Sequence, residues 1–201
     1  MSTVTTRTPQ QDRSRETRTK ILETAVEVLA TRGWQGATTS VVEARSGVSR
    51  GALQHHFPTR EALFLTALEH MFEIQRGRVD TNVEPQDGED RFDLLVTQIL
   101  ENYVSDEFKA ALQIWTAAAA EPSLKERILP LEAKFARGIF DIAVEVLGAD
   151  TSDERTRRVI QTTLDLARGL GLADLLSDDS ERRAKVARFW AAELRTIKRI
   201  E

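Results

Sequence analysis

The chain has 201 residues, of which 41% are hydrophobic and 30% are charged, a balance typical of a folded globular protein. The absence of cysteine excludes disulfides, thiolate metal sites and cysteine nucleophiles, and three histidines are too few for a histidine-rich metal site. The longest stretch without a charged residue, 110–120, is too short for a membrane-spanning helix, and the first 20 residues lack the apolar run of a signal peptide. We therefore expect a cytoplasmic protein without a cofactor.

The formal net charge of −4 is divided unequally along the chain. Residues 1–62 contain nine Lys and Arg and six Asp and Glu, a net charge of +3, which leaves −7 for residues 63–201. A basic front and an acidic back suggest that the front binds a polyanion and that the back has another role.

The apolar residues follow a helical period and no stretch alternates as a strand does, so we predict an all-α protein of about nine helices. Residues 1–14 are expected to form a disordered tail. Pro130 predicts a kink in its helix or a division into two shorter helices. The predicted helices occupy residues 15–32, 38–46, 49–57, 60–79, 91–104, 106–120, 122–147, 153–176 and 180–199.

The helices at 38–46 and 49–57 have the anatomy of a helix-turn-helix, with a Gly47 turn between them and a supporting helix on each side. Thr38 or Thr39 is predicted to cap the first of them, and Ser49 the second. A DNA reader of this kind projects the N-terminal half of its second helix into a major groove about 12 Å wide.

The candidate DNA contacts follow from that geometry. Arg50 can pair with guanine or clamp a phosphate, so replacing it should relax the base preference. Arg60 is expected to meet a phosphate, so that Arg60→Ala would weaken binding equally on all sequences. Each residue also has an ordinary reading as a cap, a solvated charge or a packing group. The predicted DNA-binding residues are Thr38, Thr39, Ser49, Arg50, Gly51, Ala52, Gln54, His55, His56 and Arg60.

The run from Gly47 to Phe64 resembles the recognition helix and the following helix start of the TetR family of bacterial transcriptional regulators, and residues 33–39 resemble the family's approach to the helix-turn-helix. The match covers about residues 15–70. It implies a DNA-binding domain at 15–62 and an effector-binding and dimerisation domain at 63–201. It also implies a homodimer whose recognition helices enter successive major grooves, roughly 34–36 Å apart, on a near-palindromic operator.

Two positions depart from the family pattern. Gln54 stands where the family usually has an aromatic residue, most often tyrosine, so Gln54 either reads a base such as adenine or replaces a backbone contact. Glu43 stands where a small residue is usual, which predicts a local difference in packing between the two short helices.

An effector pocket is the role that the resemblance implies for part of the back of the chain. Tyr103, Trp115 and Pro130 favour a pocket, because they are large, partly polar or disruptive groups in otherwise ordinary helices. The alternative is that these side chains are plain core. We expect a hydrophobic or amphipathic effector. The candidate ligand-binding residues are His70, Phe92, Ile99, Tyr103, Leu112, Gln113, Trp115, Thr116, Phe135 and Ile139.

The last two predicted helices carry apolar stripes with several small residues. The resemblance implies that two such helices from each subunit form an intermolecular four-helix bundle. Packing within one chain is the alternative. The candidate dimer residues are Val159, Thr163, Ala167, Val186, Phe189, Trp190 and Leu194.

The sequence thus predicts a dimeric repressor that a small molecule releases from DNA, through a tilt of the helix at 60–79 that changes the separation of the recognition helices. The alternative is a helical protein-binding adaptor, or a regulator without a small-molecule effector. An enzyme is not expected. Gly169-Leu170-Gly171 follows no strand, as a dinucleotide site would require, and the pair His70 and Glu73 lacks a third metal ligand.

Overall fold

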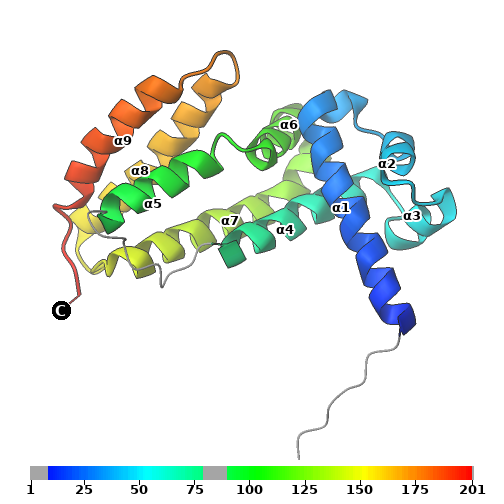
Figure 1. Ribbon diagram of the computed structural model, residues 1–201, viewed down its shortest axis with the longest axis horizontal. Helices are drawn as coiled ribbons and strands as arrows, with labels where there is room; N and C mark the ends of the chain where they lie inside the picture. The colour runs from blue at the N-terminus through cyan, green and yellow to red at the C-terminus, as the bar shows by residue number, and fades with distance from the viewer. Residues whose placement is uncertain (1–8, 79–89, 201) are drawn as a thin grey trace, which may run out of the picture. The chain divides into compact units, whose positions relative to one another are not determined.

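The computed structural model describes residues 9–78 and 90–200, and in these ranges the regular structure is helical apart from one isolated β-bridge between Ala149 and Arg199 (Figure 1). The predicted all-α fold is confirmed. Across the described ranges, no helix is both long and apolar enough to cross a membrane. The helices are α1 Pro9–Gly36, α2 Thr39–Ser46, α3 Arg50–His56, α4 Arg60–Arg78, α5 Arg91–Asn102, α6 Asp106–Ala120, α7 Pro122–Leu147, α8 Glu154–Asp174 and α9 Ser180–Leu194.

The two ends of α1 differ from the prediction. The helix begins at Pro9, so residues 9–14 are helical and not part of a tail, while residues 1–8 lie outside the described ranges. Proline suits a helix start, because its missing N–H would have no partner in the first turn. At the other end Gly33 has φ 66° and ψ 172°, and a short helical segment follows it as far as Gly36. Gly33 therefore breaks α1 without ending it.

The C-terminal helix is shorter than predicted, because α9 ends at Leu194, residues 195–197 form turns and residues 198–200 run along the α7–α8 loop. The N–H of Asp150 donates to the carbonyl of Lys198 (2.9 Å), and the N–H of Ile200 donates to the carbonyl of Gly148 (2.8 Å). These two bonds hold residues 198–200 against the α7–α8 loop, while the N–H groups of residues 195–197 still donate to carbonyls of α9.

Pro130 lies inside α7, which runs as one helix from Pro122 to Leu147. The predicted division into two shorter helices is therefore wrong. Pro130 is on the exposed side of α7, where water can solvate the carbonyl of Glu126 that loses its N–H donor.

The described residues form two compact units. Unit 1 contains residues 9–71 and 110–125, and unit 2 contains residues 72–109 and 126–200. The division does not fall at the predicted boundary, residue 62, because α4 continues across that point and places Leu63, Phe64 and Leu68 in the core of unit 1. The other large, almost fully buried side chains of unit 1 are Ile21, Leu22, Leu29, Ile114 and Leu124.

In unit 2, α5, α8 and α9 pack side by side (Figure 1). Gly171 on α8 lies directly against the backbone of Tyr103, the residue that ends α5. The Tyr103 ring is 2% exposed and makes an edge contact with Phe108, with ring centroids 4.9 Å apart. Burial raises the pKa of the Tyr103 phenol, although the guanidinium of Arg168 beside it acts in the opposite direction. The close approach of two backbones at Gly171 thus fixes the far end of α5.

The near end of α5 is held from α9. Asp90 caps α5 by accepting from the N–H of Phe92 (2.9 Å), and Arg195 donates to Asp90 and Asp93 at 2.7 Å each. The backbone hydrogen bond from Phe92, followed by the bond from Arg195, lowers the pKa of Asp90. Both ends of α5 are therefore fixed to the last two helices of the chain.

Candidate nucleic-acid interface

The turn between α2 and α3 is built by three local signals. Thr38 caps α2 with its hydroxyl, which accepts from the N–H of Val41 (3.3 Å), and Ser49 caps α3 in the same way with Ala52 (3.3 Å). Between them Gly47 has φ 67°, and its N–H donates to the carbonyl of Glu43 (3.0 Å). Only glycine adopts this left-handed conformation without a steric cost, so Gly47 fixes where α2 ends and α3 begins.

The N-terminal half of α3 is exposed. Arg50, Gly51, Gln54 and His55 are exposed, and a Cβ built at Gly51 would meet nothing within 4 Å. The first turn of α3 is therefore exposed and carries no side chain at Gly51, which allows its backbone to approach base edges closely.

The buried side of α3 anchors it to unit 1. Leu53 is 2% exposed and Phe57, the residue that ends the helix, is 4% exposed. Ala52 and His56 are half-buried. Of the predicted contacts in α2, Thr38 is exposed and Thr39 is half-buried. All ten predicted DNA-binding residues lie in unit 1.

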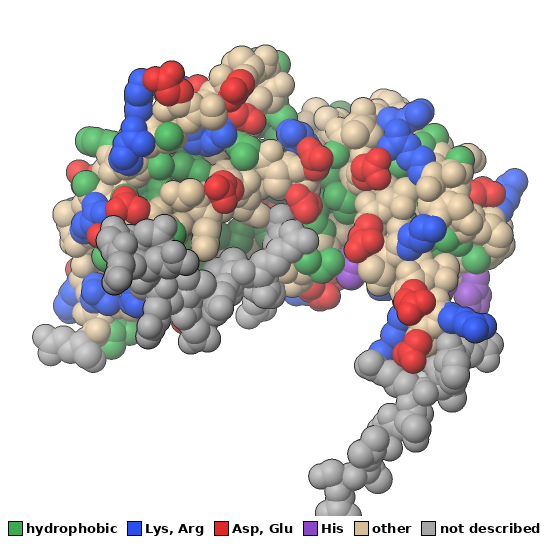
Figure 2. Space-filling view, in the orientation of Figure 1, with side chains coloured by type: hydrophobic (Ala, Val, Ile, Leu, Met, Phe, Trp, Pro, Cys, Tyr) green, Lys and Arg blue, Asp and Glu red, His purple; other side chains and the backbone are tan. Residues whose placement is uncertain are grey.

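Basic groups gather at the C-terminal end of α3, where histidine side chains reach the surface (Figure 2). The His55 and His56 rings are 5.5 Å apart, and the guanidinium of Arg18 on α1 lies 5.7 Å from the ring centroid of Phe57. Burial lowers the pKa of His56, and the charges of His55 and Arg18 lower it further. Arg18 was not among the predicted contacts, because only the packing of α1 beside α3 brings it here.

Arg60 takes a different position from the one predicted. Its guanidinium is directed into the protein, where Nε donates to the carbonyl of Ala37 (2.6 Å) and a terminal nitrogen donates to the carbonyl of Trp34. It also lies over the Trp34 ring, 3.9 Å from the centroid. Burial of the half-exposed side chain lowers its pKa. The expected phosphate contact stays a prediction, and the observed contacts are all within the chain.

Comparison with known proteins agrees with this geometry. The model of the bacterial regulatory proteins of the tetR family matches residues 21–67, which include α2 and α3. The chain is 29% identical over 184 residues to the HTH-type transcriptional regulator CymR of Pseudomonas putida, covering 90% of each protein. It is 44% identical over 54 residues to the HTH-type transcriptional repressor AcnR of Corynebacterium glutamicum, covering 27% of this chain and 29% of AcnR.

Residues 21–67 thus match the TetR family of bacterial transcriptional regulators, and over most of its length the chain is similar to an HTH-type transcriptional regulator. The family consists of regulators and not of enzymes, so the prediction of a non-enzymatic protein is confirmed. The fold is that of a putative TetR-family regulator from Rhodococcus sp., with a TM-score of 0.68, 21% identity and coverage of 91% of this chain and 98% of that one. The multidrug binding protein EbrR, solved in complex with imidazole, has a TM-score of 0.56, 22% identity and coverage of 86% and 93%.

The ten predicted effector contacts are divided between the two units. The contacts of Thr116 and Phe135 are the following. Thr116 is exposed, and its hydroxyl donates to the carbonyl of Leu112 (2.8 Å). Phe135 stacks on Phe72 with centroids 3.6 Å apart. Unit 1 contains His70, Leu112, Gln113, Trp115 and Thr116, and unit 2 contains Phe92, Ile99, Tyr103, Phe135 and Ile139.

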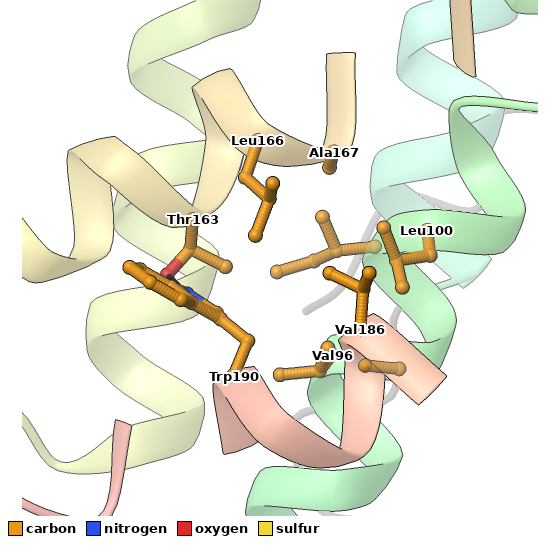
Figure 3. Close-up of a pocket in the computed structure, with 9 residues that line it drawn as sticks. Val96, Leu100, Thr163, Leu166, Ala167, Val186 and Trp190 are labelled. Carbon is orange, nitrogen blue, oxygen red and sulfur yellow. Dashed lines mark hydrogen bonds between the residues drawn. The ribbon is translucent and has the colours of Figure 1, made fainter. Parts of the chain in front are cut away.

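Unit 2 contains a small, tightly packed apolar pocket between α5, α8 and α9 (Figure 3). The indole N–H of Trp190 donates to the hydroxyl of Thr163 (2.8 Å), so these two polar groups satisfy each other at its wall. Ile99 is the only predicted effector contact among the lining residues, which are Val96, Ile99, Leu100, Thr163, Leu166, Ala167, Val186, Ala187 and Trp190.

The stripe predicted to form the dimer face packs largely inside the chain. Thr163, Ala167 and Leu194 are at most 4% exposed, and their side chains are therefore already covered within unit 2. Val186 and Trp190 are half-buried and line the pocket against α5. Within unit 2 the apolar side chains of α5 line the same pocket as Thr163, Ala167, Val186 and Trp190, and the partner contact of the five residues stays a prediction.

Other apolar side chains of α8, of α9 and of the turn between them remain uncovered in this chain. Phe189 is 66% exposed and Val159 is half-buried. Hydrophobic side chains also reach the surface where α8 turns into α9 (Figure 2), where Leu172 is 47%, Leu175 45% and Leu176 93% exposed. No sequence signal separated these residues from the covered stripe.

Proposed function

We propose that this TetR-type regulator is a dimeric repressor that binds a near-palindromic operator and that a hydrophobic or amphipathic small molecule releases. The observation that carries the proposal is the open first turn of α3, capped by Ser49, with Arg50 exposed at its start and Leu53 anchored beneath. The repressor role is supported by AcnR, which is named a transcriptional repressor.

The proposed reading of DNA divides the interface into two kinds of contact. Arg50 and Gln54 read base edges in the major groove, and Gly51 and Ala52 allow the backbone to approach. Thr38, Thr39, Ser49, His55 and His56 hold phosphates and carry no sequence information. Arg18 on α1 adds a phosphate contact at the end of α3, supported by its place beside Phe57.

The proposed dimer places a second copy of the chain on the exposed apolar surface of α8 and α9. An apolar residue as exposed as Leu176 or Phe189 is normal singly, but four exposed apolar residues on α8, α9 and the turn between them indicate a surface that a partner covers. Two half-sites of a near-palindromic operator require two copies related by a two-fold axis. The proposed contact residues are Leu172, Leu175, Leu176 and Phe189, with Val159 at the edge.

The proposed effector response rests on half-buried aromatic groups and on one structural relative. Trp115 in unit 1 and the stacked pair Phe72 and Phe135 in unit 2 offer apolar faces to a small molecule. EbrR, of the same fold, is titled a multidrug binding protein. The effector shifts the equilibrium only by its preference for the state that does not fit the operator. A regulator of this kind acts in the cytoplasm, where the bacterial chromosome is.

Selection from a random duplex library tests the function directly. We expect the wild-type chain to enrich a near-palindromic sequence. Its affinity should fall about a thousandfold or more between 50 and 200 mM salt, because several phosphate contacts release counterions. Fluorescence anisotropy with the enriched duplex and a scrambled one gives both values. Failure to enrich any sequence at low salt would refute the proposal, and the enriched duplex is the reagent for an effector screen.

The dimer face can be tested with one matched pair of variants. Phe189→Glu should raise the dimer dissociation constant about thirtyfold or more, because a buried aromatic anchor contributes roughly 2 kcal/mol or more to an interface. Ala184→Glu adds the same charge to an exposed position on another side of α9 and should leave association unchanged. Sedimentation velocity over a concentration series measures both. Equal dissociation constants for the two variants would place the interface elsewhere.

A further inference from the structure

We propose that Arg60 is a positioning residue and not a phosphate ligand. The element that it positions is the helix-turn-helix of α2 and α3, called here the DNA reader. The inference rests on the proposed DNA-binding function and changes the role assigned to one of its residues. Arg60 is the first residue of α4, immediately after the connection from α3. The two carbonyls that it binds belong to Trp34, in the last segment of α1, and to Ala37, in the connection between α1 and α2. Arg60 thus ties together the two chain segments that enter and leave the α2–α3 reader.

The two carbonyls need a donor because of the local backbone. Gly33 breaks α1 with its positive φ. The N–H of Val41, four residues after Ala37, donates to the Thr38 hydroxyl. The fork of Arg60 supplies N–H donors to both carbonyls. A guanidinium has several donors on separate nitrogens in a fixed plane, so it can direct a different nitrogen at each carbonyl, whereas an ammonium has a single nitrogen.

Aromatic side chains hold the guanidinium from the other side. Its central carbon lies 3.9 Å from the Trp34 ring centroid and 5.6 Å from that of Phe64. The two rings make an edge contact with centroids 5.9 Å apart, and they are 7% and 0% exposed. A guanidinium over an aromatic face gains cation–π attraction. The hydrogen bonds and the stacking together direct the Arg60 fork into unit 1.

The consequence for DNA reading is geometric. The backbone on one side of the reader is fixed at Ala37, next to the Thr38 cap, and on the other side at Arg60, which follows the Pro58-Thr59 connection. Loss of this link frees α2 and α3 to tilt together while their exposed side chains stay the same. A tilted α3 loses base contacts before it loses the general attraction of a basic surface for phosphates.

Hydrogen exchange of the full chain tests the link without DNA. Arg60→Lys retains the positive charge but loses the planar fork, and Arg32→Lys, at an exposed position of α1, is the matched control. We expect amide exchange in residues 38–46 to rise about tenfold in Arg60→Lys alone, because local opening becomes easier. The segment 160–170 of unit 2 should be unchanged. Wild-type exchange in 38–46 would overturn the inference.

DNA binding then separates positioning from phosphate contact. For Arg60→Lys we expect about a tenfold loss of affinity for the duplex that the wild type selects, the size of one lost base contact. Affinity for a scrambled duplex and the salt dependence should stay at the values of Arg32→Lys. A phosphate contact at Arg60 predicts a different pattern. Arg60→Lys would then bind both duplexes about as tightly as the wild type, because lysine keeps the positive charge. Arg60→Met would lower the affinity for both duplexes and reduce the slope of log affinity against log salt concentration by about 0.9 per chain.

The outcomes for the inference and for the proposed function are distinct. If the wild-type chain selects no duplex, the proposed function fails, while the exchange measurement still decides whether Arg60 links the two connections. If the wild type selects a duplex and Arg60→Lys binds it with unchanged affinity, the proposed function stands and the positioning role is refuted.

Discussion

Gly171→Ala will destabilise the protein by roughly 1–3 kcal/mol or more, whereas Gly169→Ala, two residues earlier in α8, will leave it unchanged or stabilise it by up to about 1 kcal/mol. A Cβ at Gly171 would overlap the carbonyl oxygen of Tyr103 and lie 2.9 Å from Cε1 of Phe108. The first obstacle is backbone, so a side-chain rotation cannot remove it. A Cβ at Gly169 would meet nothing within 4 Å and gains the helix propensity of alanine.

Urea denaturation at one fixed protein concentration measures both variants, since the stability of a dimer depends on concentration. The expected order of midpoints is Gly169→Ala at or above wild type, and Gly171→Ala well below it. Two variants with the same midpoint would mean that α5 and α8 do not approach at Gly171 as closely as the structure shows. Near-ultraviolet circular dichroism reports in addition whether the Tyr103 and Phe108 contact survives in the folded variant.

The glycine pair also shows what a sequence can and cannot reveal. Gly169-Leu170-Gly171 has the spacing of half a dinucleotide fingerprint, and the absence of a preceding strand correctly argues against that reading. The actual reason for Gly171 is its contact with the backbone of Tyr103, almost seventy residues earlier in the chain. No local pattern indicates which helix α8 packs against.

Local signals predicted the reader well, because the forces that form it are local. The caps at Thr38 and Ser49 act on N–H groups three residues away, and the φ of Gly47 is a property of one residue. Helix ends were predicted less well where distant segments compete for the backbone. The segment 198–200 is an example, since the carbonyl of Lys198 and the N–H of Ile200 bond to the α7–α8 loop and not to α9.

Side-chain direction was the main limit of prediction at the candidate site. A stripe such as Thr163 and Ala167 is apolar enough for either a partner subunit or α5, and only the packing of unit 2 shows that it lines a pocket with α5. In the same way, an arginine at the start of α4 looks like a surface charge until Trp34 and Ala37 are found beside it. Periodicity gives the exposed and buried sides of a helix, but not the identity of the neighbour.

Arg50→Ala will relax base preference strongly. Arg50 is exposed at the start of α3, where a bidentate pair with guanine is worth about 1–3 kcal/mol per half-site. We therefore expect the discrimination between the selected duplex and one with a symmetric change at the contacted base pair to fall by roughly tenfold to a hundredfold for each half-site. Binding to a scrambled duplex should weaken only by the loss of charge. Anisotropy titrations at one salt concentration give both numbers.

Arg45→Ala is the matched control for that measurement, because it removes the same charge from α2. Its ion pair with Glu27 (3.0 Å) is between exposed side chains and contributes little to stability. The control should weaken selected and altered duplexes equally, so that their ratio is that of the wild type. If Arg50→Ala behaves in the same way, Arg50 contacts the backbone alone. Base reading would then fall to Gln54, one helical turn further along α3, where the family pattern usually has an aromatic residue.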